Sequence, residues 1–180
     1  MSVLVALDEG SIAEEVLAAI TPYLVRTGTE AHLVTVMDPG DIHGTRSSVL
    51  YDPWATGDLT GGLLPIGSHQ QATVVESRTQ AFSRTHKARA EYLEELGGRH
   101  LPREQFHVHV EASSDVADSI VRLARKFGAD AIAIGTHARR GMRRVILGSI
   151  AEEVIRKSDV PVFVVREGMG GAGDSKAASA

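Results

Sequence analysis

The stretch ADAIAIGTHARRGMRRVILGSIAEEVIRKSDVPVFVV, residues 129–165, contains the pattern that decides the fold. A short apolar run, AIAIG (131–135), is followed by a helical pattern from Ser149 and then by a β-branched run, VPVFVV (160–165). Two strand-like runs joined through a helix indicate parallel strands, because the crossover returns the chain to the same end of the sheet. AIAI is apolar throughout, as expected for a central strand that is buried on both faces.

The same alternation of strand and helix patterns extends over most of the chain. The remaining predicted elements are strands at 3–7, 31–37 and 105–111, and helices over Ser11 to about Arg26, roughly 71–97 and about Ser114 to Phe127. Strands that alternate with helices in this way predict an α/β fold, in which helices cover both faces of an open parallel sheet. We therefore expect a three-layer, Rossmann-like architecture with five strands.

Two segments interrupt this alternation. Residues 38–70 are rich in glycine, proline and turn-forming residues and contain Tyr51 and the only tryptophan, Trp54. A connection of that length is a binding lid or a loose insert, and the composition favours neither. The residues from 168 to 180 are small and polar and are predicted to be a disordered tail. We expect one domain over 1–167 with a long loop insert at about 38–70.

The composition narrows the classes of partner. The chain has 180 residues, of which 43% are hydrophobic, with a net charge of −4 and a pI near 6.0. A slightly acidic chain is not expected to bind nucleic acid or anionic membranes through a broad basic surface. No run is long enough to span a membrane, and a strand that starts at Val3 leaves no room for a signal peptide. Without cysteine there is no disulfide or thiolate site, so we expect a cytoplasmic protein.

One octet occurs twice, as GSIAEEVL at 10–17 and GSIAEEVI at 148–155. Serine followed three residues later by glutamate, before apolar residues at helical spacing, is typical of a capping box. The pairs Ser11–Glu14 and Ser149–Glu152 therefore predict two helix starts with serine caps. A helix start presents unpaired amides that attract anions when a glycine leaves the approach open, although helix capping alone also explains both copies.

The second octet follows a basic, glycine-containing segment, GTHARRGMRRVILGS, at residues 135–149. Ligands of open parallel sheets bind beyond the carboxyl ends of the strands, and this segment begins at such an end. The glycines and arginines suit a phosphate group, but an ordinary loop with solvated arginines at 139, 140, 143 and 144 fits the spacing equally well. A P-loop is excluded because the chain has no GxxxxGK motif.

This segment resembles the nucleotide-binding signature of the universal stress protein family. That signature is a glycine, two residues, a second glycine, nine residues, and then glycine and serine or threonine, which Gly135, Gly148 and Ser149 match in register. VLVALD near the start and GSIAEEVIRKSDVPVFVVR near the end resemble the family's first strand and its last helix and strand. The chain departs from the pattern at Ala138, where glycine is expected, at Ala6, where proline is frequent, and in the length of 38–70.

The resemblance implies a strand order of 3-2-1-4-5 and an adenine nucleotide as ligand: ATP, which carries Mg²⁺, or AMP or ADP. It places Asp8 at the base or ribose, although a turn or cap aspartate would look the same, and Val36 against the adenine. It places the backbone of His137 at the phosphates, assisted by arginines. The full implied site comprises Ala6, Leu7, Asp8, Val36, Ile134, Gly135, His137, Ala138, Arg139, Arg140, Gly148, Ser149 and Ile150.

Other patterns carry less information. His107 and His109 alternate on a predicted strand and so face the same side, but the sequence shows no third ligand nearby, and we predict no metal site. No GxSxG motif supports hydrolase chemistry, and no residue is evidently placed to activate water, so we predict no catalytic residues and do not assign even slow ATP hydrolysis. The apolar run 160–165 is expected at the sheet edge, where the resemblance and two-fold symmetry imply a homodimer.

The combined interpretation is a stress-response protein that binds an adenine nucleotide and acts as a nucleotide-responsive regulatory or interaction module. Two alternatives remain open. The chain is a dimeric scaffold of the same family without nucleotide binding, or an enzyme of the wider adenine-nucleotide hydrolase superfold whose insert binds a second substrate.

Overall fold

The computed structural model describes residues 1–42, 46–50, 71–75, 77–136 and 147–166. The chain divides into two compact units, one formed by 1–41 and 86–180 and the other by 42–85. The first unit contains the large sheet and the candidate site. The second is described separately below.

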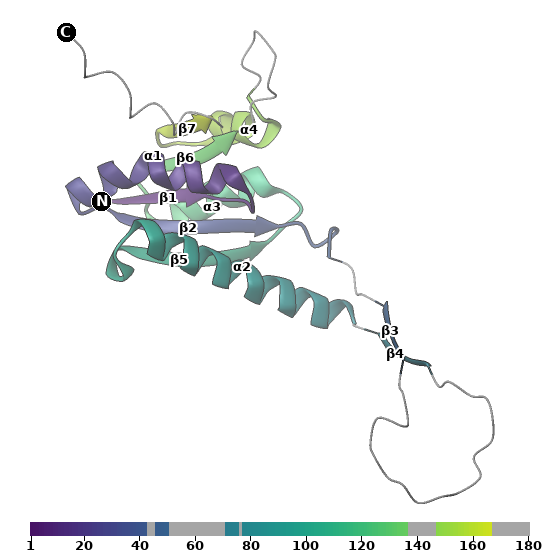
Figure 1. Ribbon diagram of the computed structural model, residues 1–180. Coiled ribbons are helices and arrows are strands. Elements are labelled where there is room, and N and C mark those ends of the chain that lie inside the picture. Colours follow the sequence, from purple (N-terminus) through teal and green to yellow (C-terminus); the bar gives the residue numbers. More distant parts are fainter. Residues whose placement is uncertain (43–45, 51–70, 76, 137–146, 167–180) are drawn as a thin grey trace, which may run out of the picture. The chain divides into compact units, whose positions relative to one another are not determined.

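The first unit is built on a parallel sheet, shown in Figure 1, in which the described strands follow the order β5-β2-β1-β6-β7. The strands are β1 (Ser2–Ala6), β2 (Glu30–Met37), β5 (Phe106–Ala112), β6 (Ala131–Thr136) and β7 (Val162–Arg166). Counted along the chain within this sheet, the order is 3-2-1-4-5, so the expected fold class and strand order are confirmed.

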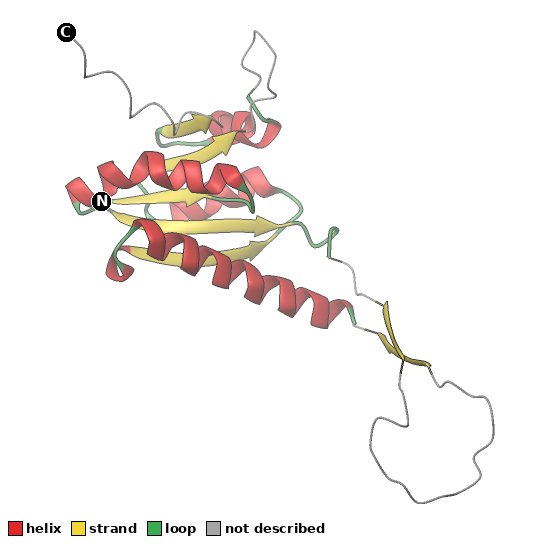
Figure 2. Cartoon of the chain, viewed as in Figure 1, coloured by secondary structure: helices red, strands yellow, loops and turns green. Residues whose placement is uncertain are grey.

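Helices cover both faces of the sheet, as Figure 2 shows. The helices are α1 (Ser11–Thr27), α2 (Arg78–His100), α3 (Val116–Phe127) and α4 (Ser149–Lys157), with a short 3-10 turn, η1 (Arg103–Gln105), before β5. Alternate residues of β1 enter different cores: Val3 and Val5 pack with α1 and the end of α2, and Leu4 packs with α3 and α4. This burial on both sides explains why β1 is apolar at every position.

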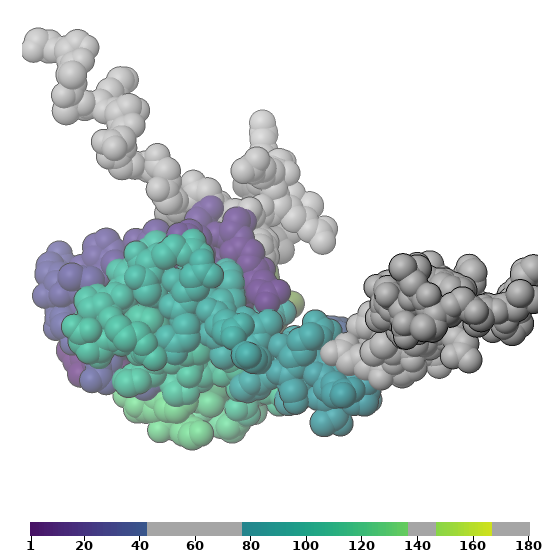
Figure 3. Space-filling view, turned by 60° about the horizontal axis from the view of Figure 1, so that its bottom comes forward, coloured from purple at the N-terminus to yellow at the C-terminus, as the bar shows by residue number. Residues whose placement is uncertain are grey.

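The α1 and α2 layer is also joined by polar contacts at its surface. Glu14 of α1 accepts a hydrogen bond of 3.2 Å from Arg99 and lies 2.9 Å from Nε2 of His100, both in the last turn of α2. Figure 3 shows the purple N-terminal segment lying against the teal surface of this layer. These contacts hold the start of α1, which lies near the candidate site, against α2.

The second unit differs from the prediction for this region. A helix was expected from about residue 71, but Gln71–Val75 forms strand β4, which pairs antiparallel with β3 (Arg46–Leu50). The run ATVV at 72–75 is rich in β-branched residues, which favour strands. The helix starts later because Ser77 and Gln80 form a capping box. The Ser77 hydroxyl accepts a hydrogen bond of 3.2 Å from the backbone amide of Gln80. The Gln80 side chain accepts one of 2.9 Å from the backbone amide of Ser77.

The sequence predictions for the rest of the insert and for the tail are not tested. Tyr51 and Trp54 lie outside the described residues, as do 168–180. Whether the insert forms a lid therefore stays a prediction. The antiparallel pairing of β3 and β4 does show that part of 38–70 has strand structure, which the composition did not predict.

Both copies of the octet begin helices, but the predicted serine caps are wrong. Ser11 and Ser149 are the first helical residues, and the N-cap positions are Gly10 and Gly148. The two starts also differ in conformation: Gly10 has φ +138°, a region open mainly to glycine, whereas Gly148 has φ −61° and ψ 147°, which any residue adopts. The chain thus enters each helix one residue earlier than predicted, without a side-chain cap from the N-cap residue.

Candidate functional site

The carboxyl ends of β1 and β6 lie side by side, because Ala6 pairs with Ile134 in the parallel register. Asp8 follows β1 and Gly135 lies near the end of β6. Helices α1 and α4 begin beyond these strand ends, after Gly10 and Gly148 respectively. The two octets therefore flank one edge of the sheet, which is where open parallel sheets bind ligands.

Gly135 is required by the packing between β6 and α1. A β-carbon at this position would lie 2.5 Å from Cγ1 of Ile12 and 3.0 Å from Cγ2 of Val16, both on α1. These distances are too short for carbon atoms, so a side chain here would push the helix away from the sheet. The first glycine of the signature is thus explained by helix packing, whatever ligand the site binds.

Thr136 ties the two ends of the signature together. Its buried hydroxyl accepts a hydrogen bond of 2.9 Å from the backbone amide of Gly148, so the last residue of β6 contacts the N-cap of α4. A buried amide without a partner is costly, and this bond satisfies it. Thr136 was not among the residues predicted from the sequence, because a threonine at the end of a strand has no distinctive pattern.

Asp8 is held by two donors. Its Oδ1 accepts a 2.8 Å hydrogen bond from the amide of Glu9 and a 3.1 Å hydrogen bond from Nη1 of Arg89 on α2. The Asp8 side chain is nevertheless 75% exposed, whereas that of Arg89 is only 22% exposed. Nε of Arg89 lies 3.1 Å from the Glu9 carboxylate, a charge contact without hydrogen-bond alignment. Arg89 was not among the predicted site residues, since it lies 81 residues along the chain from Asp8.

The other residues implied by the resemblance fall into three groups. Side chains of the first group are buried in the two cores, so only their backbone is available to a ligand: Ala6, Leu7 and Ile134. Val36 is partly buried against the α3 side of the sheet, while Ser149 and Ile150 are exposed at the start of α4. The last group lies outside the described residues: His137, Ala138, Arg139 and Arg140. The composition of the site therefore stays a prediction.

A second cluster of titratable residues lies on the α3 face, near the β5 edge. His107 and His109 of β5 share this face as predicted, and His32 of β2 joins them because it pairs with His107 in the strand register. Nδ1 of His32 lies 3.2 Å from Nε2 of His109, and both rings stack on Phe127, with centroid distances of 4.6 and 4.2 Å.

A hydrogen bond joins two rings of this cluster. Nδ1 of His32 and Nε2 of His109 lie within hydrogen-bond distance, and the ring centroids are 5.4 Å apart. Among the described residues, no group of three potential ligands is arranged to hold a metal ion. The expectation of a half-exposed strand face at His107 and His109 agrees with this arrangement.

The histidine cluster predicts a pH-dependent stability. Burial lowers the pKa of His32 and of His109, and the neighbouring histidines lower both pKa values further; Lys126 also lowers that of His109, while Glu30 opposes the shift at His32. The unfolded chain then binds more protons than the folded chain below about pH 6.5, so the free energy of unfolding decreases as pH falls through this range.

We expect the melting temperature to decrease as the pH is lowered from about 7.5 to 5.5. His109→Gln should reduce the slope of melting temperature against pH. Thermal denaturation at a series of pH values measures this. Identical slopes for the wild type and His109→Gln would contradict the prediction.

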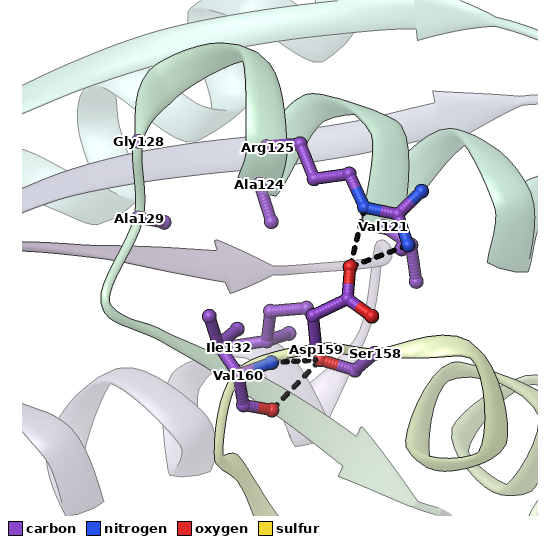
Figure 4. Close-up of a pocket in the computed structure, with 9 residues that line it drawn as sticks. All are labelled: Val121, Ala124, Arg125, Gly128, Ala129, Ile132, Ser158, Asp159 and Val160. Carbon is purple, nitrogen blue, oxygen red and sulfur yellow. Dashed lines mark hydrogen bonds and ion pairs between the residues drawn. The ribbon is translucent and has the colours of Figure 1, made fainter.

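A small cavity of about 60 Å³ lies at the opposite end of β6 from the candidate site. Figure 4 shows that it is lined mainly by apolar side chains of α3 and β6, with Arg125 and Asp159 forming an ion pair at its rim. The Ser158 hydroxyl is bonded to the backbone of Val160. These polar groups are already paired with one another, so the cavity offers no evident ligand contact.

Among the described residues, no helix is both long and apolar enough to cross a membrane.

Comparison with known sequences identifies the family. The model of the universal stress protein family matches residues 65–166, more than half of the chain. Universal stress protein MJ0531 of Methanocaldococcus jannaschii is 43% identical over 61 residues, which cover 33% of this chain and 36% of that protein. Stress response protein NhaX of Bacillus subtilis is 36% identical over 52 residues, covering 29% of this chain and 31% of that protein. The chain thus aligns with about a third of the length of these curated relatives.

Solved structures share the fold over almost the entire chain. The protein MJ0577 of M. jannaschii superposes with a TM-score of 0.61 at 19% identity, covering 92% of this chain and 94% of that chain. The universal stress protein of Archaeoglobus fulgidus in complex with dAMP has a TM-score of 0.52 at 20% identity, covering 91% and 96%. A universal stress protein in complex with cAMP has a TM-score of 0.53 at 14% identity, covering 92% and 95%. With the matched family model, the strand order and the paired helix starts at one sheet edge, these findings show that the chain belongs to the universal stress protein family.

Proposed function

We propose that this protein binds an adenine nucleotide, ATP or its mono- or diphosphate, at the carboxyl ends of β1 and β6. The observation that carries the proposal is the pairing of two glycine-capped helix starts across these adjacent strands, with Asp8 at one of them. Two proteins of similar fold were solved with dAMP and with cAMP, which supports the choice of adenine.

The phosphates are assigned to the start of α4. The N-cap Gly148 contributes no side-chain cap, and a helix start of this kind presents its first amides to an anion. The hydroxyl of Thr136 holds the Gly148 amide itself, and this bond fixes where the helix begins. Arg139 and Arg140 are proposed to assist at the phosphates, and ATP would bring its own Mg²⁺.

The nucleoside is assigned to the ends of β1 and β2. The Asp8 carboxylate is well exposed and would repel phosphates, so it suits hydrogen bonds from the base or ribose. Val36, on the strand next to β1, supplies an apolar contact for the adenine. Binding of this kind makes the protein a nucleotide-responsive module in the stress response, and we assign it no catalytic residues.

Two measurements on the purified protein test the proposal. Native mass spectrometry shows whether a nucleotide remains bound, and calorimetric titration with AMP, ADP and ATP gives the affinities. We expect at least one of the three to bind. No bound nucleotide and no titratable binding at about 1 mM would overturn the proposal in favour of a family scaffold without nucleotide.

Asp8→Ala is expected to reduce the affinity for adenine nucleotides by about fivefold to tenfold, while the affinity for inorganic triphosphate stays unchanged or increases. The reason is that Asp8 is assigned to the nucleoside and not to the phosphates. Glu104→Ala, which removes an exposed carboxylate just before β5 at the other end of the sheet, is the matched control. If Asp8→Ala keeps both the affinity and the selectivity of the wild type, Asp8 is not part of the site.

A homodimer through β7 is a second proposal, and a scaffold without nucleotide would need it as well. β7 is at the edge of the sheet, and its Phe163 is 45% exposed although it is a large apolar side chain. Such an edge is prone to pair with another strand. Two copies of β7 in antiparallel pairing would cover it.

Phe163→Glu is expected to convert the dimer into monomers, because it places like charges near each other across the paired strands. Val162 and Val164 are poorer choices, since both pack against the core on the α3 side. Ile155→Glu, on α4 and 44% exposed, is the matched control and should remain dimeric. Light scattering measures the mass, and a wild-type monomer would end this proposal.

A further inference from the structure

We infer that Arg89 is a positioning and charge-balancing residue of the nucleotide site, acting through Asp8. The inference rests on the proposed function and adds a residue from α2 to it. Nη1 of Arg89, on α2, donates a hydrogen bond to Asp8, and the guanidinium also contacts Glu9. The family signature does not include this position.

The two oxygens of the Asp8 carboxylate differ in their contacts. Oδ1 accepts hydrogen bonds from the Glu9 amide and from Arg89, at 2.8 and 3.1 Å. Both described hydrogen bonds of the Asp8 side chain end on Oδ1, and the side chain is 75% exposed. Anchoring one oxygen fixes the rotamer, so that Oδ2 is presented to a ligand without further loss of side-chain entropy.

Arg89 is itself well placed to act as an anchor. Its side chain is mostly buried, at 22% exposure, and a second contact to the Glu9 carboxylate holds the guanidinium from another direction. A largely buried arginine with one hydrogen bond and a second charge contact keeps its geometry better than the mobile side chain of an exposed ion pair. The fixed element in this site is therefore Arg89, and Asp8 is positioned by it.

The same guanidinium offsets negative charge at the edge of the sheet where the nucleotide is proposed to bind. Asp8 and Glu9 contribute two negative charges at this edge, and Arg89 offsets one of them. Without Arg89, the uncompensated carboxylates would repel ATP more than AMP, and would not repel adenosine at all. If the Asp8 carboxylate is no longer held in position, in contrast, the binding of every ligand that contains the nucleoside is weakened. The two effects are separable by comparing ligands of different charge.

The test is calorimetric titration of adenosine, AMP and ATP into the wild type and Arg89→Gln, with thermal denaturation as a check on folding. We expect Arg89→Gln to reduce the affinity for adenosine by about fivefold and the affinity for ATP by about fifteenfold. Arg89→Lys keeps the positive charge but not the simultaneous contacts of the guanidinium with Asp8 and Glu9. It should therefore have the wild-type ratio of ATP affinity to adenosine affinity, while its affinity for adenosine stays below that of the wild type.

Two further variants isolate the role of Asp8. Lys87→Gln removes one positive charge from the same helix, at an exposed ion pair with Glu91, and should stay within about twofold of the wild type for every ligand. In an Asp8→Asn background, Arg89→Gln should no longer change the affinity for adenosine, because the carboxylate that Arg89 positions is gone.

The outcomes separate this inference from the proposed function. If the wild type binds and Arg89→Gln binds all ligands within about twofold of it, Arg89 has no role and the nucleotide site stands. An undiminished effect on adenosine in the Asp8→Asn background would show that Arg89 does not act through Asp8. If the wild type binds none of the three ligands, the proposed function is wrong and the role of Arg89 is wrong with it.

Discussion

Gly97→Ala is expected to lower the free energy of unfolding by about 2 kcal/mol, and Gly98→Ala, one residue further along the same helix, to raise it by up to about 1 kcal/mol. A β-carbon at Gly97 would lie 2.6 Å from Cε2 of Phe106 and 2.7 Å from Cδ1 of Leu33, whereas one at Gly98 would meet nothing within 4 Å. Phe106 and Leu33 are fully buried and cannot move aside. The clash outweighs the gain in helix propensity at Gly97, and only the gain remains at Gly98.

Thermal denaturation of the two variants measures this difference. For a chain of this size, a loss of about 2 kcal/mol corresponds to a decrease in melting temperature of roughly 4–8 °C. The Gly98→Ala variant controls for the change in helix propensity, which is common to both. Equal melting temperatures for the two variants would contradict the close packing of α2 on the sheet.

Gly135→Ala is expected to cost about 2 kcal/mol of stability and to displace the start of α1. The new β-carbon would lie 2.5 Å from Cγ1 of Ile12, which is buried between α1 and the sheet. Gly148→Ala is the control within the same signature. There, among the described residues, the β-carbon would meet Oγ1 of Thr136 at 3.3 Å, a tight contact, but the backbone is unstrained, so we expect a smaller loss.

A double-mutant cycle with Ile12→Ala separates the clash from other effects of Gly135→Ala. Removing the Ile12 side chain opens a cavity that the new methyl group partly fills, so we expect the two changes to be non-additive by at least about 1 kcal/mol. Chemical denaturation of the four proteins gives the coupling. Strict additivity would mean that contact with Ile12 is not the reason for glycine at 135.

These two glycines also bear on how the signature is interpreted. A glycine at a predicted phosphate loop is readily assigned to ligand binding, but Gly135 is explained by the packing of α1 on β6. Among the described residues, a β-carbon at Gly148 would have one tight contact, with Oγ1 of Thr136 at 3.3 Å, so a loss of nucleotide affinity in Gly148→Ala without a loss of stability would belong to the ligand. The same motif therefore contains one residue constrained by folding and one that is open to a functional role.

The sequence by itself determined the five strands of the large sheet, most of the helices and the parallel arrangement of that sheet. These follow from patterns over a few neighbouring residues, such as AIAI or the octet that begins with Gly148, and local patterns are readable without the fold. The order of the strands followed from the resemblance to a known family, and the sheet confirms it. The prediction from local sequence was wrong at 71–75, where a β-branched run that forms strand β4 was assigned to the helix that follows it.

Only the tertiary structure decided which distant residues meet. The register of β2 and β5 brings His32 to His109 across 77 residues of sequence, and the docking of α2 brings Arg89 to Asp8 across 81. The close approach of Gly97 to Phe106 likewise depends on how deeply α2 sits on the sheet. Such contacts depend on strand register and on the depth of helix packing, which are set by the whole core and not by any local run of residues.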